Sequence, residues 1–185
     1  MRKNHPSVLR GIVTGIVAGI TATLIMDQFQ SLTAAGQKAT EKKIKLAQGE
    51  PLSQIEHEQE QKEKQAAEQE GSTEKVARKI AQATGSQITD ADKKKAGQAV
   101  HYIFGTLMGV VYSVSAELLP EVTTGAGTAF GTILFLGADE VAVPAFQLAP
   151  PPTDAAPTDH LQNWAAHIVY GGSLELLRSL VRRVL

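Results

Sequence analysis

Long apolar runs, separated by charged or proline-rich stretches, dominate the hydrophobic pattern of the chain. Each run holds roughly 16–21 residues, close to the about 20 residues that an α-helix needs to cross the hydrocarbon core of a bilayer. The four runs cover residues 11–26, 99–119, 125–143 and about 161–177. Asp27, Pro120 and Pro144 end the first three, and arginines follow the fourth. The pattern predicts an all-α fold, a four-transmembrane-helix bundle.

The segment between the first and second runs has the opposite character. Asp27–Val100 carries 12 of the 18 Lys and Arg residues and 12 of the 19 Asp and Glu residues. Residues 33–95 have few large apolar side chains with which to offset the entropy of ordering, so we expect a long polar, partly helical extramembrane excursion. Ser72 is a candidate cap for one short helix within it. The predicted parts are 1–26 (cytoplasmic tail and first transmembrane helix), 27–98 (charged excursion) and 99–185 (three further transmembrane helices and a basic cytoplasmic tail).

Two alternatives compete with four spans. The first run follows Arg2, Lys3 and Arg10, a basic start that also suits a cleaved signal peptide, although no small-x-small cleavage site precedes Asp27. The runs also suit the core of a soluble helical bundle. Helices of soluble bundles have a polar face, whereas these runs are apolar nearly all round, which favours the membrane.

Basic residues predict the orientation. Both tails carry Lys or Arg, whereas the connection over residues 144–160 has none. Positive residues favour the cytoplasmic side of a membrane. An even number of spans with both termini cytoplasmic satisfies this rule and places the excursion outside.

Small residues recur at four-residue spacing in the runs. This spacing makes a groove that lets a second helix approach closely in a membrane. We expect these grooves to pack helices within the chain or to join copies of it in a homo-oligomer. The glycines predicted to pack helices are Gly11, Gly15, Gly19, Gly105, Gly109, Gly127, Gly131 and Gly171.

Composition excludes several classes of protein. The net charge of −1 provides no basic field for nucleic acid, and the absence of cysteine excludes disulfides, thiolate metal sites and a cysteine nucleophile. No G-x-S-x-G, H-E-x-x-H or Walker loop is present. We therefore expect no enzymatic activity and no cofactor, with the lipid bilayer as the main partner.

An ordered pattern of polar and glycine positions spans roughly residues 96–183. It consists of His101-x-x-Phe104-Gly105, Tyr112, Ala116-Glu117-x-x-Pro120, Gly125-x-Gly127-x-x-x-Gly131, Ala138-Asp139-Glu140-x-x-Val143-Pro144 and His167-x-Val169-Tyr170-Gly171-x-x-x-Glu175-x-x-Arg178. In order and spacing this pattern resembles the YagU-like family of uncharacterised bacterial inner-membrane proteins. Residues 15–30 are weakly similar, and residues 33–85 do not align. The resemblance implies a multi-pass protein of the bacterial inner (plasma) membrane, without an assigned activity and loosely associated with acid tolerance.

The predicted topology gathers ionisable groups near the outer face. These are Asp27, His101, Asp139, Glu140 and His167. Ionisable groups inside spans are costly and mark functional sites, and histidines beside carboxylates titrate near pH 5–7. The competing interpretations are hydrogen bonds that only tie the helices together and a divalent metal site. No single helix has two histidines at ligand spacing, so no metal is predicted.

A second group, near the inner face, comprises Glu117, Glu175 and Arg178, with Arg10 close by. Carboxylates at this depth pair with arginines and fix the helix register, so a structural role is expected. His5, His57 and His160 lie outside the runs and are expected to be solvated.

Three functions remain open from the sequence. The first is a pH-linked membrane protein that acts through the outer group. The second is a structural or partner-binding membrane protein whose charged segment, residues 33–95, docks another component. The third is a small transporter or channel subunit.

Overall fold

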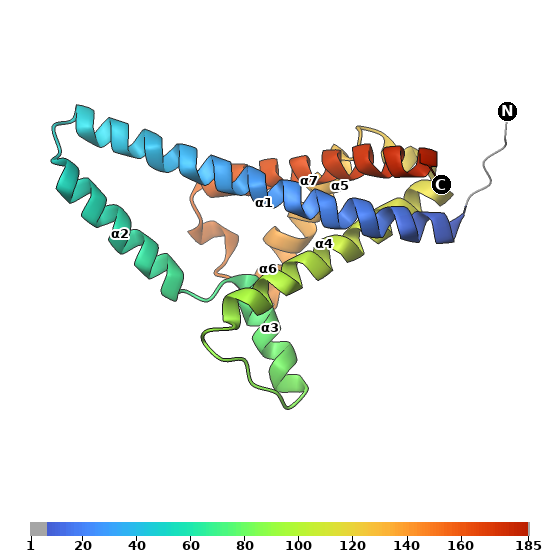
Figure 1. The fold of residues 1–185 in the computed structure, drawn as a ribbon, viewed down its shortest axis with the longest axis horizontal. Helices are drawn as coiled ribbons and strands as arrows, with labels where there is room; N and C mark the ends of the chain where they lie inside the picture. Colours follow the sequence, from blue (N-terminus) through green and yellow to red (C-terminus); the bar gives the residue numbers. More distant parts are fainter. Residues whose placement is uncertain (1–6, 185) are drawn as a thin grey trace.

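The structure, a computed structural model, describes residues 7–184, and all regular elements in that range are helices (Figure 1). They are α1 (Val8–Ala47), α2 (Leu52–Glu68), α3 (Ser72–Ala83), α4 (Lys93–Leu118), η1 (Pro120–Thr123), α5 (Thr128–Leu134), η2 (Phe135–Ala142), α6 (Val143–Ala145), η3 (Pro152–Asp154) and α7 (Pro157–Val184). Of these, η1 and η3 are short 3₁₀ turns, and η2 is a π-helix that continues α5 into α6.

Four long helical segments form one bundle. Helix α1 lies between α4 and α7, and α7 also packs against α5. The start of α1 and the end of α7 lie at the same end of the bundle (Figure 1). The core that joins the helices consists of Ala18, Ala22, Met26, Tyr112, Ala166, Tyr170 and Leu174. The two tyrosines of this core come from α4 and α7 and pack against alanines of α1 and α7.

Three helical segments are long and apolar enough to cross a membrane: α1, α4 and the continuous segment Thr128–Ala145. Large apolar side chains such as Ile16, Leu107 and Ile133 are exposed on them, as expected of surfaces that face lipid. Helix α7 forms where the fourth run was predicted and has 28 residues. It is not apolar enough to be counted as a span, because buried polar residues, among them His167 and Arg178, lie along it. The chain therefore has three apolar helical segments of membrane-spanning length, which is compatible with a membrane protein.

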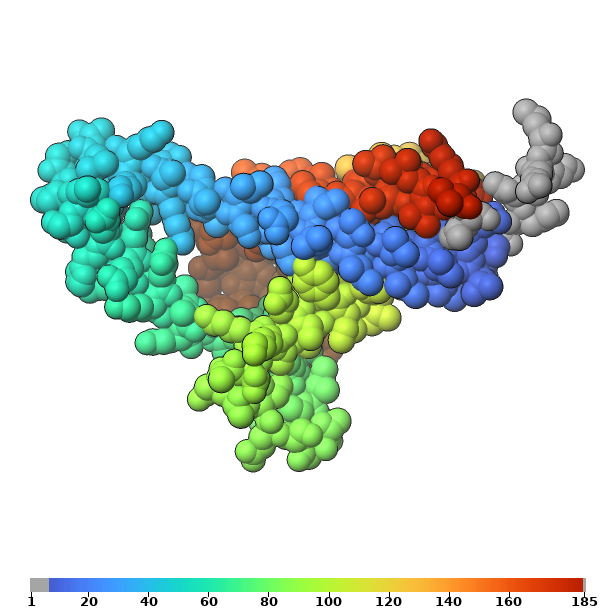
Figure 2. Space-filling model, viewed as in Figure 1, coloured from blue at the N-terminus to red at the C-terminus, as the bar shows by residue number. Residues whose placement is uncertain are grey.

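Helix α1 does not end at the predicted boundary, Asp27, but continues to Ala47. Helix α2 then turns back at an angle to it, and ion pairs cross between the two helices (Figure 1). The N–O distances are 2.8 Å for Lys38–Glu63, 3.0 Å for Lys42–Glu56 and 2.7 Å for Lys62–Glu41. These side chains are 36–62% exposed, so each pair contributes only about 0–1 kcal/mol. Up to Glu68 the charged segment, for which a partly helical excursion was predicted, is thus a weakly held helical hairpin that projects from the bundle (Figure 2).

Helix α3 begins at Ser72, so its N-cap is Gly71 and not Ser72 as predicted, and the helix packs across α4. Its buried face consists of Ala77 and Ala81. Gly97 of α4 allows this close crossing, because a methyl group on it would lie 2.6 Å from the Glu74 Cγ atom. This contact places the start of α3 beside one end of the bundle.

Glycines bring α1 and α4 into backbone contact. A methyl group on Gly11 would lie 2.9 Å from the Cα atom of Val114, and one on Gly15 would lie 2.5 Å from the Cα atom of Val110. Real Cβ atoms do not approach other atoms so closely, because interiors are packed at van der Waals separation. The same geometry recurs where α1 meets Gly105 and Gly109 of α4, and around Gly19.

The contact between α5 and α7 uses the remaining predicted glycines. Gly127 meets the carbonyl of Gly171, and Gly131 meets the carbonyl of His167. Gly127 also has φ of 81°, in the left-handed region that favours glycine. The predicted grooves are thus filled by helices of the same chain.

Candidate functional site: a histidine-lined cavity

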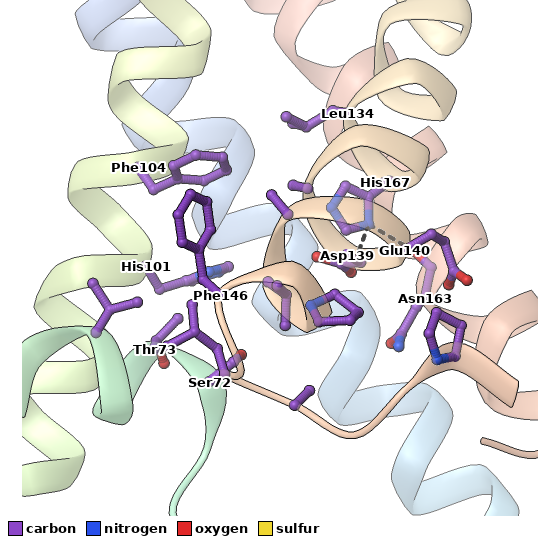
Figure 3. Close-up of a pocket in the computed structure, with 18 of the residues that line it drawn as sticks. Ser72, Thr73, His101, Phe104, Leu134, Asp139, Glu140, Phe146, Asn163 and His167 are labelled. Carbon is purple, nitrogen blue, oxygen red and sulfur yellow. Dashed lines mark hydrogen bonds and ion pairs between the residues drawn. The ribbon is translucent and has the colours of Figure 1, made fainter. Parts of the chain in front are cut away.

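A cavity of about 680 Å³ opens at the end of the bundle away from the start of α1 (Figure 3). Its walls come from α1, α3, α4, η2, α7 and the proline-rich connection between α6 and α7. Most of the lining is apolar, with a few polar groups, as in small-molecule sites. The histidine and acidic residues that line it are His101, Asp139, Glu140, Asp154, His160 and His167. We call this end of the molecule the cavity end.

The π-helix η2 positions the two consecutive acidic residues of the cavity. It runs for 8 residues, and its buried Phe135 lies against the His167 ring with 5.7 Å between centroids. The wider turn of a π-helix re-aims the side chains that follow it, and such turns are frequent at functional sites. Asp139 and Glu140 consequently extend toward two different histidines of α7.

His101 joins α4 to α1 at the edge of the cavity. Its Nε2 atom lies 3.0 Å from the Oδ1 atom of Asp27, and both side chains are about one-quarter to one-third exposed. The ring also contacts Tyr102 edge to face. Asp27 therefore does not line the cavity itself but contacts His101, which does.

His167 and Asp139 face one another without a hydrogen bond. The Nδ1 atom of His167 lies 2.9 Å from the carbonyl of Asn163, which only accepts, so this nitrogen carries a proton. Its distance to the Oδ2 atom of Asp139 is 3.8 Å, which is an ion-pair separation but too long for a hydrogen bond. Within the described part of the chain, the Asp139 carboxylate has no hydrogen-bond donor.

His160 bonds on both sides of its ring, contrary to the expectation that it is solvated. Its Nδ1 atom lies 2.7 Å from Glu140 Oε1, and its Nε2 atom lies 2.9 Å from the carbonyl oxygen of Pro152. Both partners are acceptors, so the geometry suits an imidazolium that donates from both nitrogens. The hydrogen bond with Glu140, followed by that with the Pro152 carbonyl, raises the pKa of His160. His160 thereby ties the proline-rich connection and η2 to the start of α7.

We expect His160→Gln to lose stability in a pH-dependent manner. Because the folded-state pKa is raised, the contribution of His160 is fully present below its unfolded pKa of about 6.5 and is lost as the pH rises through the folded-state value. The melting temperature of the purified protein, measured from pH 5 to pH 9, should show a difference between wild type and variant that is largest in acid. His57→Gln, on the exposed face of α2, is the control. A constant difference, or one that grows with pH, would contradict the assignment.

All five residues predicted for the outer group lie at the cavity end. Four of them line the cavity, and Asp27 is paired with the His101 that does. His160 and Asp154 also line the cavity, and the sequence interpretation missed both. Within residues 7–184, no three His, Cys, Asp or Glu side chains converge as a metal ion requires.

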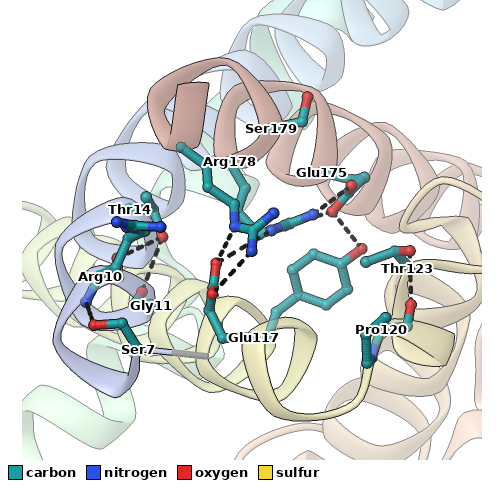
Figure 4. A network of polar contacts seen from close by, with 12 residues as sticks. Ser7, Arg10, Gly11, Thr14, Glu117, Pro120, Thr123, Glu175, Arg178 and Ser179 are labelled. Carbon is teal, nitrogen blue, oxygen red and sulfur yellow. Dashed lines mark hydrogen bonds and ion pairs between the residues drawn. The ribbon is translucent and has the colours of Figure 1, made fainter. Parts of the chain in front are cut away.

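The opposite end of the bundle holds a network of arginines and glutamates, here called the arginine end (Figure 4). Arg178 binds Glu175 through two hydrogen bonds of 2.7 Å each, and Tyr112 donates to the same carboxylate at 2.8 Å. Arg182 binds Glu117 through its Nε atom and, at 3.2 Å, through Nη2. Glu117 has no exposed side-chain surface, so its charge is compensated entirely by these arginines.

The predicted inner group thus comes together, with Arg182 and Tyr112 as additions. Arg178 connects its two halves, since its Nη1 atom lies 3.9 Å from Glu117 Oε1. Arg10 lies nearby at the start of α1 (Figure 4). Two glutamates balance two arginines, and every charged group of the network has a partner, which is the arrangement of a structural tie.

The sequence model of a family described as "Protein of unknown function (DUF1440)" matches residues 51–176. The chain belongs to this family. No curated protein and no solved structure matches it.

The DUF1440 match begins at α2, well before residue 96, where the resemblance noted in the sequence begins. Helices α2 and α3 are therefore part of the family region, although residues 33–85 did not align in that resemblance. All three cavity histidines lie inside the matched range. Asp27, Arg178 and Arg182 lie outside it.

Proposed function

We propose that this DUF1440 protein is a non-enzymatic, pH-responsive protein of the bacterial inner membrane. In this proposal α7 is a fourth span, over residues 161–177, both termini are cytoplasmic, and the cavity end faces outward. The resemblance to the YagU-like family supports the inner membrane and a link to acid tolerance. The bilayer surrounds the bundle, and the exposed α1–α2 hairpin is the surface proposed for a protein partner. Homo-oligomers remain a proposal, although the glycine grooves are occupied within the chain.

One observation carries the proposal: three histidines from two helices line one cavity together with three carboxylates. Histidine is the side chain whose charge changes between pH 5 and pH 8. Protonation of His101 and His167 strengthens their contacts with Asp27 and Asp139, which lie 3.0 and 3.8 Å away. Acidification therefore tightens α4 against α1, and α7 against η2.

The arrangement of the helices supports the proposed orientation. Arg10 lies at the arginine end (Figure 4), and so does Arg182, which binds Glu117, whereas no Lys or Arg occurs between residues 144 and 160. The positive-inside rule then favours a cytoplasmic arginine end. Reporter fusions after residues 60, 122, 155 and 185 test this, and we expect them to lie outside, inside, outside and inside. An outward C-terminus would overturn the four-span topology.

Survival of cells in acid tests the pH response. We expect His101→Gln and His167→Gln to insert and fold as wild type does at neutral pH, because glutamine retains hydrogen bonding without titrating. Survival after acid challenge should nevertheless fall at least tenfold relative to cells that express the wild type. His57→Gln, in the hairpin, should survive as wild type does. Wild-type survival of the His101→Gln and His167→Gln variants, as of His57→Gln, would contradict the proposal.

A further inference from the structure

The cavity has an unbalanced set of charged groups. Three carboxylates line it, and no lysine or arginine of residues 7–184 does. The nearest lysines belong to α3, and their ammonium groups are bound to carbonyls of the connection, Lys75 to Leu148 at 3.0 Å and Lys79 to Phe146 at 2.9 Å. His160 offsets Glu140. With His101 and His167 neutral, the cavity thus has a negative field.

Asp139 is the carboxylate that remains available to a ligand. No donor in the described chain hydrogen-bonds it, and its side chain is 36% exposed. The proton on His167 Nδ1 is committed to the Asn163 carbonyl. A partly buried carboxylate without a donor is less well stabilised than one in water, and a bound cation would relieve that cost.

Aromatic surface faces Asp139 across the cavity. Phe104 of α4 and Phe146 of the connection lie next to one another on the opposite wall (Figure 3). They are 41% and 67% exposed. Exposed apolar surface of this kind inside a cavity indicates a binding site. Aromatic faces also attract organic cations.

We propose that the cavity binds a small organic ammonium ion with an apolar body. Its cationic head lies at Asp139, and its apolar part lies against Phe104 and Phe146. The volume of about 680 Å³ suits a molecule of this class. This inference rests on the proposed function, because the same histidines would control the affinity.

Acid should release the ligand. Protonation of His167 places a cation 3.8 Å from Asp139, in competition with the ammonium. Protonation of His101 is offset by Asp27, which lies behind it, so His101 contributes less. The other charged groups near this part of the cavity are Lys75, Lys79, Glu140 and Asp154, and His167 is the one that lies against Asp139.

Binding of benzyltriethylammonium to the full chain in lipid nanodiscs tests the inference. This ion keeps its charge at every pH, so any pH dependence of its affinity belongs to the protein. We expect calorimetry to show saturable binding at pH 7.5, at least tenfold weaker binding at pH 5, and none for the anion phenylmethanesulfonate. Asp139→Asn should weaken binding at least tenfold, whereas Asp90→Asn, in an exposed loop, should not. Empty nanodiscs provide the background.

The outcomes separate the two proposals. Equal binding of the cation and the anion, or no saturable binding beyond that of empty nanodiscs, would overturn the ammonium site, even if Asp139→Asn failed to fold. Acid survival that still depends on His101 and His167 would then leave the pH response standing. Saturable cation binding without pH dependence, together with normal acid survival of the histidine variants, would keep the site and overturn the pH response.

Discussion

Glu117→Ala is expected to destabilise the protein by about 3–5 kcal/mol, the usual cost of breaking a buried ion pair from one side. The Glu117 side chain is fully buried and binds Arg182, with Arg178 at 3.9 Å. Its removal leaves Arg178, whose side chain is only 8% exposed, with Glu175 as the remaining counter-ion. Arg182 is 33% exposed and can turn to solvent, which places the expected loss toward the lower end of that range.

Unfolding of the detergent-solubilised protein by a denaturing detergent provides the measurement. Glu121→Ala, in the exposed η1 turn four residues later, is the matched control and should change the unfolding free energy by less than about 0.5 kcal/mol. The double variant with Arg182→Ala should lose less than the sum of the two single variants, since the residues are in direct contact. Additive losses of unfolding free energy in the double variant, or a loss for Glu117→Ala no larger than that for Glu121→Ala, would contradict a stabilising pairing of Glu117 with Arg182.

Gly15→Leu is expected to separate α1 from α4 and to prevent accumulation of folded protein. Even the first added carbon would lie 2.5 Å from Val110 Cα and 2.8 Å from the Gly109 carbonyl, and backbone cannot give way as a flexible side chain can. For Gly15→Ala, overpacking of this kind should cost about 1–3 kcal/mol. This cost opposes the gain of about 1 kcal/mol that alanine normally brings to a helix interior.

Gly36 supplies the matched position on the same helix. No atom lies within 4 Å of a methyl group placed there, so Gly36→Ala should show the helix gain without the clash. Thermal unfolding of the two alanine variants side by side should therefore give shifts of opposite sign. A rise in melting temperature for both would show that α1 and α4 are not in backbone contact.

The sequence predicted the helices of the bundle because polar residues and prolines delimit apolar runs. Helix α4 ends at Leu118, beside Pro120, and the third segment reaches Ala145, one residue past Pro144. Proline in a helix interior removes a backbone donor and clashes with the preceding turn, so such boundaries are readable without a structure. A helix also forms where the fourth run was predicted, but its buried His167 and Arg178 lower its hydropathy below that of the three apolar segments.

The polar segment was harder to predict because its charged side chains do not determine which residues of α1 and α2 pair with one another. The polar end of α1 is rich in lysine and α2 is rich in glutamate, and many pairings satisfy these charges about equally, so the sequence alone does not distinguish a solvated chain from a hairpin. The extension of α1 to Ala47 runs through Ala, Gln, Lys and Glu residues that favour a helix, so the end of the apolar run at Asp27 does not mark the end of the helix.

His160 was missed for a related reason. It follows a connection rich in proline, whose path over the bundle determines whether the ring meets water or Glu140. A signal was nevertheless present, since His160 directly precedes the fourth run and so lies at the same depth as Asp27, which ends the first. Residues that end one helix and begin an antiparallel neighbour lie at the same level of a bundle, and in this molecule the cavity lies at that level.

The π-helix η2 makes chain length a determinant of the cavity. One residue more or less in a helix turns everything downstream by about 100° and shifts it by about 1.5 Å. A single-residue deletion at Gly137 would convert the wide turn into an ordinary one and point Asp139 and Glu140 away from His167 and His160 without altering either acid. Among relatives, an insertion or deletion in η2 would therefore change the chemistry of the cavity as completely as the replacement of its carboxylates.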